Sequence, residues 1–71
     1  MLVGDLIYNG DFDCNCNCEI YDCTEDGITW HEAPKIYFHN GSYIKPLDSI
    51  LDMKIKYITT DDNMIIIEAT K

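Results

Sequence analysis

The sequence predicts an α+β fold: an antiparallel sheet of four or five strands, a short N-terminal helix and a short helix near residues 46–51. Two short segments show the three-to-four-residue apolar spacing of helices, and several others show the alternation or β-branched content of strands. With 71 residues there is room for one thin core, so residues 1–71 are expected to form a single small domain. A small closed β-barrel is the alternative, because closure removes exposed sheet edges.

The N-terminal part contains one expected helix and two expected strands. Residues 2–9 have apolar side chains at helical spacing, and the Asn9-Gly10 pair suits the end of a helix. Residues 12–23 alternate between apolar and polar side chains, which is typical of a strand. A turn at residues 25–27 is expected to return the chain as a second, hairpin-paired strand over residues 28–31.

The C-terminal part contains the second helix and the remaining strands. Residues 35–39 read as a strand, and a proline opens the short helix near residues 46–51. Residues 53–58 and 64–69 form the strongest hairpin pattern, with a turn at residues 60–63. Three successive isoleucines in the last segment predict a central strand that is buried on both faces.

The charge of the chain restricts its partners. Thirteen acidic residues face five lysines and no arginine, which gives a formal net charge of -8. Proteins that bind nucleic acids displace counterions from phosphates with Lys and Arg, so this chain should be repelled by DNA, RNA and anionic membranes. The acidic residues are scattered along the chain, so they either keep a small protein soluble or match a protein partner with basic character.

The sequence predicts a cytoplasmic protein. Its first residues carry no basic region, and no run approaches the ~20 apolar residues that span a bilayer. In that compartment thiols stay reduced, so the four cysteines are expected to be free thiols rather than disulfides.

Cysteine at every second position is the most distinctive pattern of the chain. In an extended strand Phe12, Cys14, Cys16, Cys18 and Ile20 share one face. Because the large apolar residues at both ends continue the alternation, the favoured interpretation is that the thiols are small hydrophobic side chains in the core.

A zinc or copper site is the alternative for the cysteines. Ligating sulfurs in a zinc site lie only ~4 Å apart, whereas a straight strand separates Cys14 from Cys18 by roughly 13 Å. Three of these thiols therefore bind one ion only where the segment curls, although soft Cu(I) needs only two or three thiolates. The candidate ligands in this alternative are Cys14, Cys16, Cys18, Cys23, His31 and His39.

The aromatic residues indicate an interaction surface. Tyr21 lies on the strand face opposite the cysteines, so it is expected to be exposed and to form a patch with Trp30 or Tyr37. Such rings bury a large area and also form hydrogen bonds, which is why they are frequent in interfaces. Together with Glu19, they form the candidate docking face for a basic protein; alternatively, the rings cover the thin core.

Five segments of the chain resemble short acidic accessory proteins, of unassigned function, that phages and mobile elements of Gram-positive bacteria encode. The resemblance implies a cytoplasmic accessory protein, assigns no site residues and does not include the cysteine triplet. The segments are Asp5-Leu6-Ile7, Glu19-Ile20-Tyr21-Asp22, Pro46-Leu47 with Ile50-Leu51-Asp52, Ile55-Lys56-Tyr57-Ile58 and Ile65-Ile66-Ile67-Glu68-Ala69.

The expected function is therefore a non-enzymatic accessory or regulatory role through protein–protein interaction. The chain has no glycine-rich phosphate loop, no nucleophile elbow and no His-Glu-x-x-His pair. One specific version is an inhibitor whose carboxylates imitate the phosphates of DNA. A small zinc- or copper-binding protein is the alternative function, and a homodimer joined at a sheet edge is compatible with both.

Overall fold

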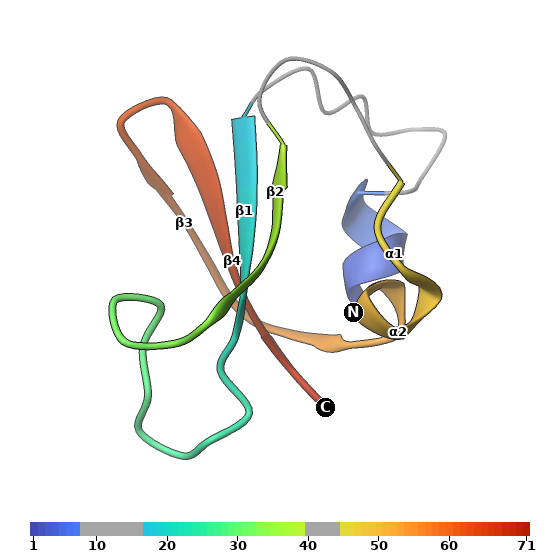
Figure 1. Ribbon diagram of the computed structural model, residues 1–71, viewed down its shortest axis with the longest axis horizontal. Helices are drawn as coiled ribbons and strands as arrows, with labels where there is room; N and C mark the ends of the chain where they lie inside the picture. Colours follow the sequence, from blue (N-terminus) through green and yellow to red (C-terminus); the bar gives the residue numbers. More distant parts are fainter. Residues whose placement is uncertain (8–16, 40–44) are drawn as a thin grey trace.

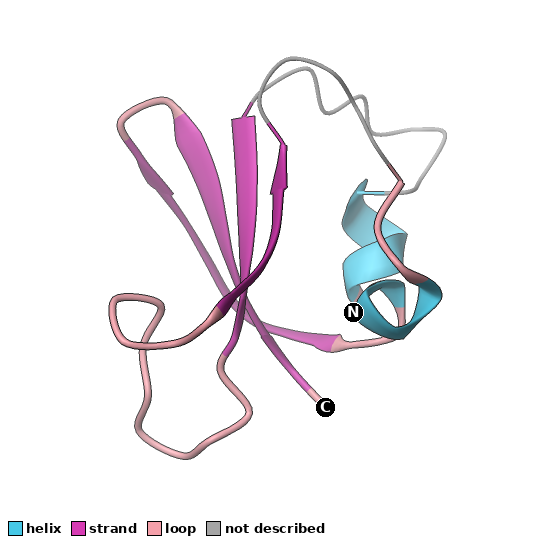
Figure 2. Ribbon diagram, in the orientation of Figure 1, coloured by secondary structure: helices cyan, strands magenta, loops and turns pink. Residues whose placement is uncertain are grey.

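The computed structural model describes residues 1–7, 17–39 and 45–71. These residues contain two short helices and four strands, in the order helix, two strands, helix, two strands (Figures 1 and 2). The elements are α1 (Val3–Ile7), β1 (Asn17–Asp22), β2 (Lys35–His39), α2 (Asp48–Leu51), β3 (Lys54–Asp61) and β4 (Met64–Thr70).

The four strands form a mixed sheet in the order β2-β1-β4-β3. β1 is antiparallel to β2 and β3 is antiparallel to β4, but the central pair, β1 and β4, is parallel. The prediction of a purely antiparallel sheet is therefore wrong. The alternation of apolar and polar residues indicates which side chains of a strand are buried, but it does not indicate whether the neighbouring strand is parallel or antiparallel. The sheet is not closed, so the barrel alternative is also wrong: β2 and β3 are its two edges.

The two faces of the sheet are covered by different parts of the chain (Figure 1). On the helix-covered face, strand residues pack against α1, α2 and the residues that follow α2. This core consists of Cys18, Ile20, Ile67 and Ala69 from the sheet with Val3, Ile7, Ile50, Leu51 and Met53.

The loop-covered face is closed by the β1–β2 loop, residues 23–34. Here Tyr21 and Ile66 of the sheet form a second, smaller core with Cys23 at the start of the loop. Side chains from further along the loop pack against this core: Ile28, Trp30 and Ala33. A chain of this length therefore covers one face with helices and the other with irregular backbone.

The expectation of a central strand buried on both faces is confirmed for β4. Ile66 and Ile67 are 2% and 0% exposed, and they belong to the cores of opposite faces. Successive side chains of a strand point to opposite sides, so such neighbours are both buried only where both faces are covered.

The predicted turns agree with the backbone angles. Asp62 and Asn63 join β3 to β4 with φ values of 52° and 63°, as in the two-residue hairpin turns that match the twist of the strands. Aspartate and asparagine tolerate this conformation better than most residues do. Gly27, in the expected turn after β1, has a φ of 79°.

The remaining element predictions have mixed outcomes. The strand over residues 35–39 and the helix near residues 46–51 are confirmed, the latter as a single turn in α2. α1 lies within the predicted 2–9 helix. Residues 28–31 are not a strand but part of a turn in which Thr29 O accepts hydrogen bonds from two backbone N–H groups three and four residues later. The Asn9-Gly10 pair, expected at the end of the first helix, lies outside the described residues.

Neither α1 nor α2, the helices of the described part of the chain, is long and apolar enough to cross a membrane.

The two-sided burial of β4 predicts a large difference between two isoleucines of one hairpin. Ile67→Ala should lower the free energy of unfolding by about 2–5 kcal/mol, because it leaves a cavity at a fully buried position. Ile58→Ala, at its 42% exposed partner position on β3, should cost less than about 1 kcal/mol. Urea unfolding of the two variants measures both values, and equal losses would contradict the described packing.

Candidate functional site

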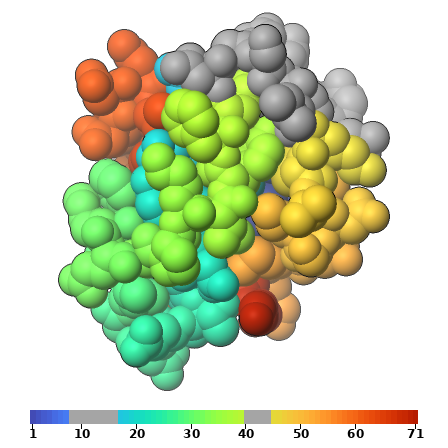
Figure 3. Space-filling model, in the orientation of Figure 1, coloured from blue at the N-terminus to red at the C-terminus, as the bar shows by residue number. Residues whose placement is uncertain are grey.

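An open groove of about 430 Å³ lies on the loop-covered face, where the β1–β2 loop meets the edge strand β3. In the space-filling view the loop (green) adjoins the end of the β3–β4 hairpin (orange) at the left of the molecule (Figure 3). We call it the Trp30 groove. Its lining residues are Thr29, Trp30 and His31 of the loop, Tyr57, Thr59, Thr60 and Asp61 of β3, and Glu68 of β4.

The loop side of the groove is held in place by hydrogen bonds to β3 and β4. The backbone N–H of Trp30 donates to Glu68 Oε2 at 3.1 Å. Lys56 Nζ donates to the carbonyl oxygens of Cys23 at 3.2 Å and Ile28 at 3.5 Å. All three hydrogen bonds join residues far apart in sequence, so the loop conformation depends on the strands beneath it.

Glu68 is the buried carboxylate of the groove. The residue is 6% exposed, and within the described residues its one hydrogen bond is the one from the Trp30 N–H. No lysine or histidine nitrogen of these residues lies within 4.0 Å of its oxygens. The carboxylate lines an open groove, and neither of its oxygens is among the buried polar atoms that lack a partner. A cationic group from outside the described residues can therefore reach it through the groove and form a charge-assisted hydrogen bond.

Aromatic rings line the same groove as this carboxylate. Tyr57 is its cross-strand partner on β3 and is 55% exposed. The ring of Trp30 is stacked with His31, at a centroid distance of 3.9 Å and an interplanar angle of 29°, and is tilted against Tyr21 at 5.8 Å. Trp30 therefore has one ring partner in the loop and one in β1, and these contacts favour its described position.

A polar network next to the groove ties β1 to β2. Tyr21 Oη donates to Glu19 Oε1 at 2.7 Å, and Lys35 Nζ lies 2.8 Å from Glu19 Oε2. Burial alone would raise the pKa of Glu19, but the hydrogen bonds from Lys35 and Tyr21 and the charge of Lys35 lower it. Burial raises the pKa of Tyr21 to about 12, together with the hydrogen bond that Tyr21 donates to Glu19 and the negative charge of Glu19.

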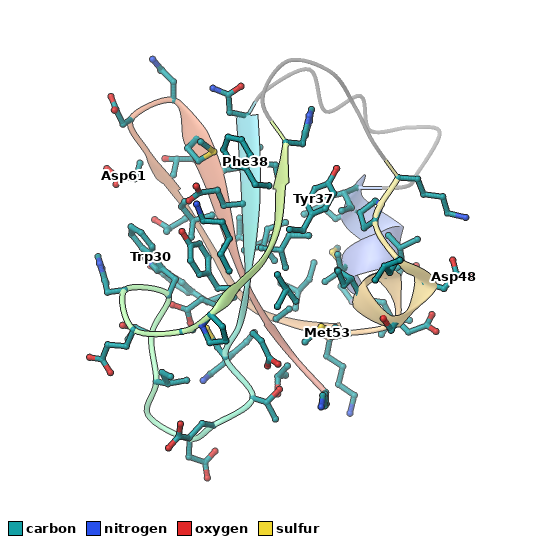
Figure 4. All side chains as sticks on the ribbon, viewed as in Figure 1. Trp30, Tyr37, Phe38, Asp48, Met53 and Asp61 are labelled. Carbon is teal, nitrogen blue, oxygen red and sulfur yellow. The ribbon has the colours of Figure 1, made fainter. Side chains whose placement is uncertain are left out.

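Three of the four predicted interaction residues share one face. Glu19, Tyr21 and Trp30 lie on the loop-covered side, but Tyr21 is only 9% exposed, so the prediction that it is exposed is wrong. The β1–β2 loop covers it. Tyr37 packs against the helix-covered core and contacts His39 at a ring distance of 6.4 Å. Figure 4 shows Trp30 and Tyr37 on opposite sides of the sheet.

The structure separates the candidate metal ligands that it describes. Cys18 is buried in the helix-covered core, as predicted, directly opposite His39 on β2. Cys23 is buried on the loop-covered face, and His31 lines the groove there. Because ligating sulfurs lie only ~4 Å apart, Cys18 and Cys23 on opposite faces do not share one zinc ion.

The other two predicted ligands, Cys14 and Cys16, lie outside the described residues. Within residues 1–7, 17–39 and 45–71 no three His, Cys, Asp or Glu side chains are grouped as a metal site would require.

Sequence reasoning missed Glu68, although the chain contains a signal for it. A single carboxylate interrupts the apolar run of the last strand, within Ile65-Ile66-Ile67-Glu68-Ala69. In a strand predicted to be buried on both faces, such a residue has no solvent-facing side available and must meet a polar partner.

Comparisons of this chain with protein-family models, with curated proteins and with solved structures found no match. The resemblance to acidic accessory proteins of mobile elements therefore stays a prediction from the sequence.

The raised pKa of Tyr21 predicts a loss of stability at high pH. The folded state favours the neutral form of Tyr21, and this preference contributes to the free energy of unfolding. The contribution is complete below about pH 10, the ordinary tyrosine pKa, and is lost as the pH rises through 12. Urea unfolding between pH 9 and pH 12 should show a steeper decline for the wild type than for Tyr21→Phe. Tyr57→Phe, at an exposed ring, is the control and should decline as the wild type does.

The environment of Cys23 predicts an unreactive thiol. Burial and the nearby Glu68 charge raise its pKa, and the opposing charge of Lys56 does not cancel their effect. In a native thiol titration at pH 8, Cys23 should react at least about tenfold more slowly than in denaturant, because the thiolate is the reactive form. Cys23→Ser should remove one slow-reacting thiol. Loss of a fast-reacting thiol instead would show that the site is open.

Proposed function

We propose that this protein is a non-enzymatic accessory protein that binds a basic segment of another protein in the Trp30 groove. The single observation that carries the proposal is Glu68: a buried carboxylate with one backbone hydrogen bond, at the base of an open groove that aromatic rings line. A lysine or arginine side chain supplies the positive charge that this carboxylate lacks among the described residues.

The groove offers such a side chain three favourable contacts. Glu68 and Asp61 supply negative charge, and a charge-assisted hydrogen bond is worth more than a neutral one. The faces of Trp30 and Tyr57 attract a cation by about 0.5–2 kcal/mol, depending on how far the site is desolvated. Tryptophan and tyrosine are also the residues that most often dominate binding energy in protein interfaces.

The net charge of the chain supports the same class of partner. At -8, the protein attracts positively charged molecules over a distance and repels acidic ones, which favours encounter with a basic surface. The described carboxylates do not form one row: Asp48 on α2 and Asp61 lie at opposite sides of the molecule (Figure 4). This distribution favours a local docking groove over an extended imitation of the DNA backbone.

The non-enzymatic part of the proposal rests on the groove's chemistry. Of the two described cysteines, Cys23 lies on the loop-covered face; it is buried and its thiol pKa is raised, as in structural rather than nucleophilic cysteines. Its neighbours in the loop-covered core are apolar or aromatic side chains.

Selection from a displayed library of random 12-residue peptides tests the proposal. With the full chain as bait, the enriched peptides should contain an excess of Lys and Arg. Glu68→Gln should bind them at least about tenfold more weakly, because the substitution removes the charge and keeps an oxygen for the Trp30 N–H. Asp48→Asn removes the same charge from an exposed position on α2 and should bind as the wild type does.

Two results would contradict the proposal. One is enrichment of acidic or uncharged peptides. The other is an equal loss of affinity in Glu68→Gln and Asp48→Asn, which would show that the net charge alone accounts for binding. Circular dichroism of both variants establishes that the fold is retained.

A further inference from the structure

We propose that the bound segment is an extended strand that pairs with the outer edge of β3 and places a lysine or arginine in the Trp30 groove. This inference rests on the proposed function and specifies its geometry. Its basis is that the edge of β3 and the buried carboxylate of Glu68 adjoin the same groove.

The outer edge of β3 is partly occupied at its first residues. The N–H of Ile55 donates to Met1 O at 2.9 Å, and Leu2 forms an isolated antiparallel bridge with Lys54. From residue 56 to residue 61, no strand among the described residues pairs with this edge. An edge of this kind is a template for another strand, because its backbone donors and acceptors have no protein partner.

The hairpin register shows which backbone groups face outward. The two-residue turn makes Asp61 and Met64 its closing, hydrogen-bonded pair, so Asp61 and Thr59 point their N–H and C=O groups towards β4. Ile58 and Thr60 therefore point theirs outward. Strict alternation from Asp61 would point the N–H of Ile55 towards β4. The pairing of β3 with β4 shifts by one residue between Ile55 and Tyr57, so the N–H of Ile55 points outward instead, as its hydrogen bond to Met1 O shows.

The side chains of β3 next to this edge indicate which residue types an added strand should contain. Tyr57, Thr59 and Asp61 lie on the loop-covered face of β3 and line the groove. Neighbouring strands lie about 4.8 Å apart, so a long side chain on the same face of an added strand crosses β3 towards Glu68. Lysine and arginine have this length and the charge that Asp61 and Glu68 complement.

The charge also decides between a foreign strand and a second copy of this chain. Each copy carries a formal charge of -8, so pairing two copies adds repulsion, whereas a basic segment removes it. At the other edge, β2 presents Lys35, which already pairs with Glu19. The occupant we assign to β3 is thus an extended segment of another protein with basic residues at alternate positions.

The probe for this inference is a blocked seven-residue peptide of alternating lysine and valine. Trp30, the one tryptophan of the chain, lines the groove, so its fluorescence reports binding. Two further peptides carry N-methyl groups on the lysine amides or on the valine amides. In a paired strand only one of these sets faces β3, so one methylated peptide should bind at least tenfold more weakly and the other within about threefold of the parent.

A variant of the protein tests the same edge. Thr60→Pro removes an outward N–H without removing a bond to β4, and proline is tolerated at such edge positions. It should weaken binding of the lysine–valine peptide at least tenfold, and by clearly more than Thr60→Val, which changes the same side chain but keeps the N–H. A thermal melt establishes that Thr60→Pro is folded, and the methylated peptides test the edge on the wild-type protein if it is not.

The outcomes separate this inference from the proposed function. If both methylated peptides bind as the parent does while Glu68→Gln weakens binding, the groove binds a cation without strand pairing, and this inference is overturned. If Glu68→Gln has no effect on any peptide, the proposed function fails as well. If light scattering shows a dimer of the chain that Thr60→Pro dissociates, a second copy occupies the edge, which also overturns the assignment.

Discussion

The structure depends on one constraint: β4 is a central strand with both faces covered. Its successive isoleucines lie in two different cores, so the chain must supply cover on each side of the sheet. With few residues to spare, α1 and α2 cover one face, and a single loop covers the other. The position of nearly every other element follows from this division.

Glu68 becomes significant because it lies in that strand. On an exposed strand a glutamate would be hydrated and would impose nothing on its neighbours. In β4 it is buried, and it accepts a hydrogen bond from the backbone of Trp30, 38 residues earlier in the chain. The same carboxylate that fixes the loop also gives the groove its negative charge, so the fold and the candidate site share one residue.

Local pattern in the sequence predicts the elements well and their arrangement poorly. The strand at residues 35–39, the one-turn helix and the last hairpin follow from spacing and turn residues that act within a few positions. The parallel pairing of β1 with β4 depends on contacts between distant segments. Residues 28–31 alternate as a strand does, but Ile28 and Trp30 face the core from a turn, whose backbone N–H finds the Glu68 carboxylate.

The candidate site divides in the same way. Alternation along β1 correctly groups Glu19 with Tyr21 on the face away from Cys18. It fails for Tyr37, whose side depends on the register between β1 and β2 and on an irregularity after Ile20. It also fails for the exposure of Tyr21, because the β1–β2 loop buries this side chain, and the alternation of residues 28–31 predicts a strand in that loop.

The strand order has a consequence for synthesis of the protein. β1 is made before β4, its parallel partner, which consists of residues 64–70. Until those residues leave the ribosome, Ile20 and its neighbours have no completed core to enter, and the sheet lacks its centre. The sheet therefore forms only after β4 has been made, and a chain that stops before residue 64 has no strand to fill the centre of its sheet.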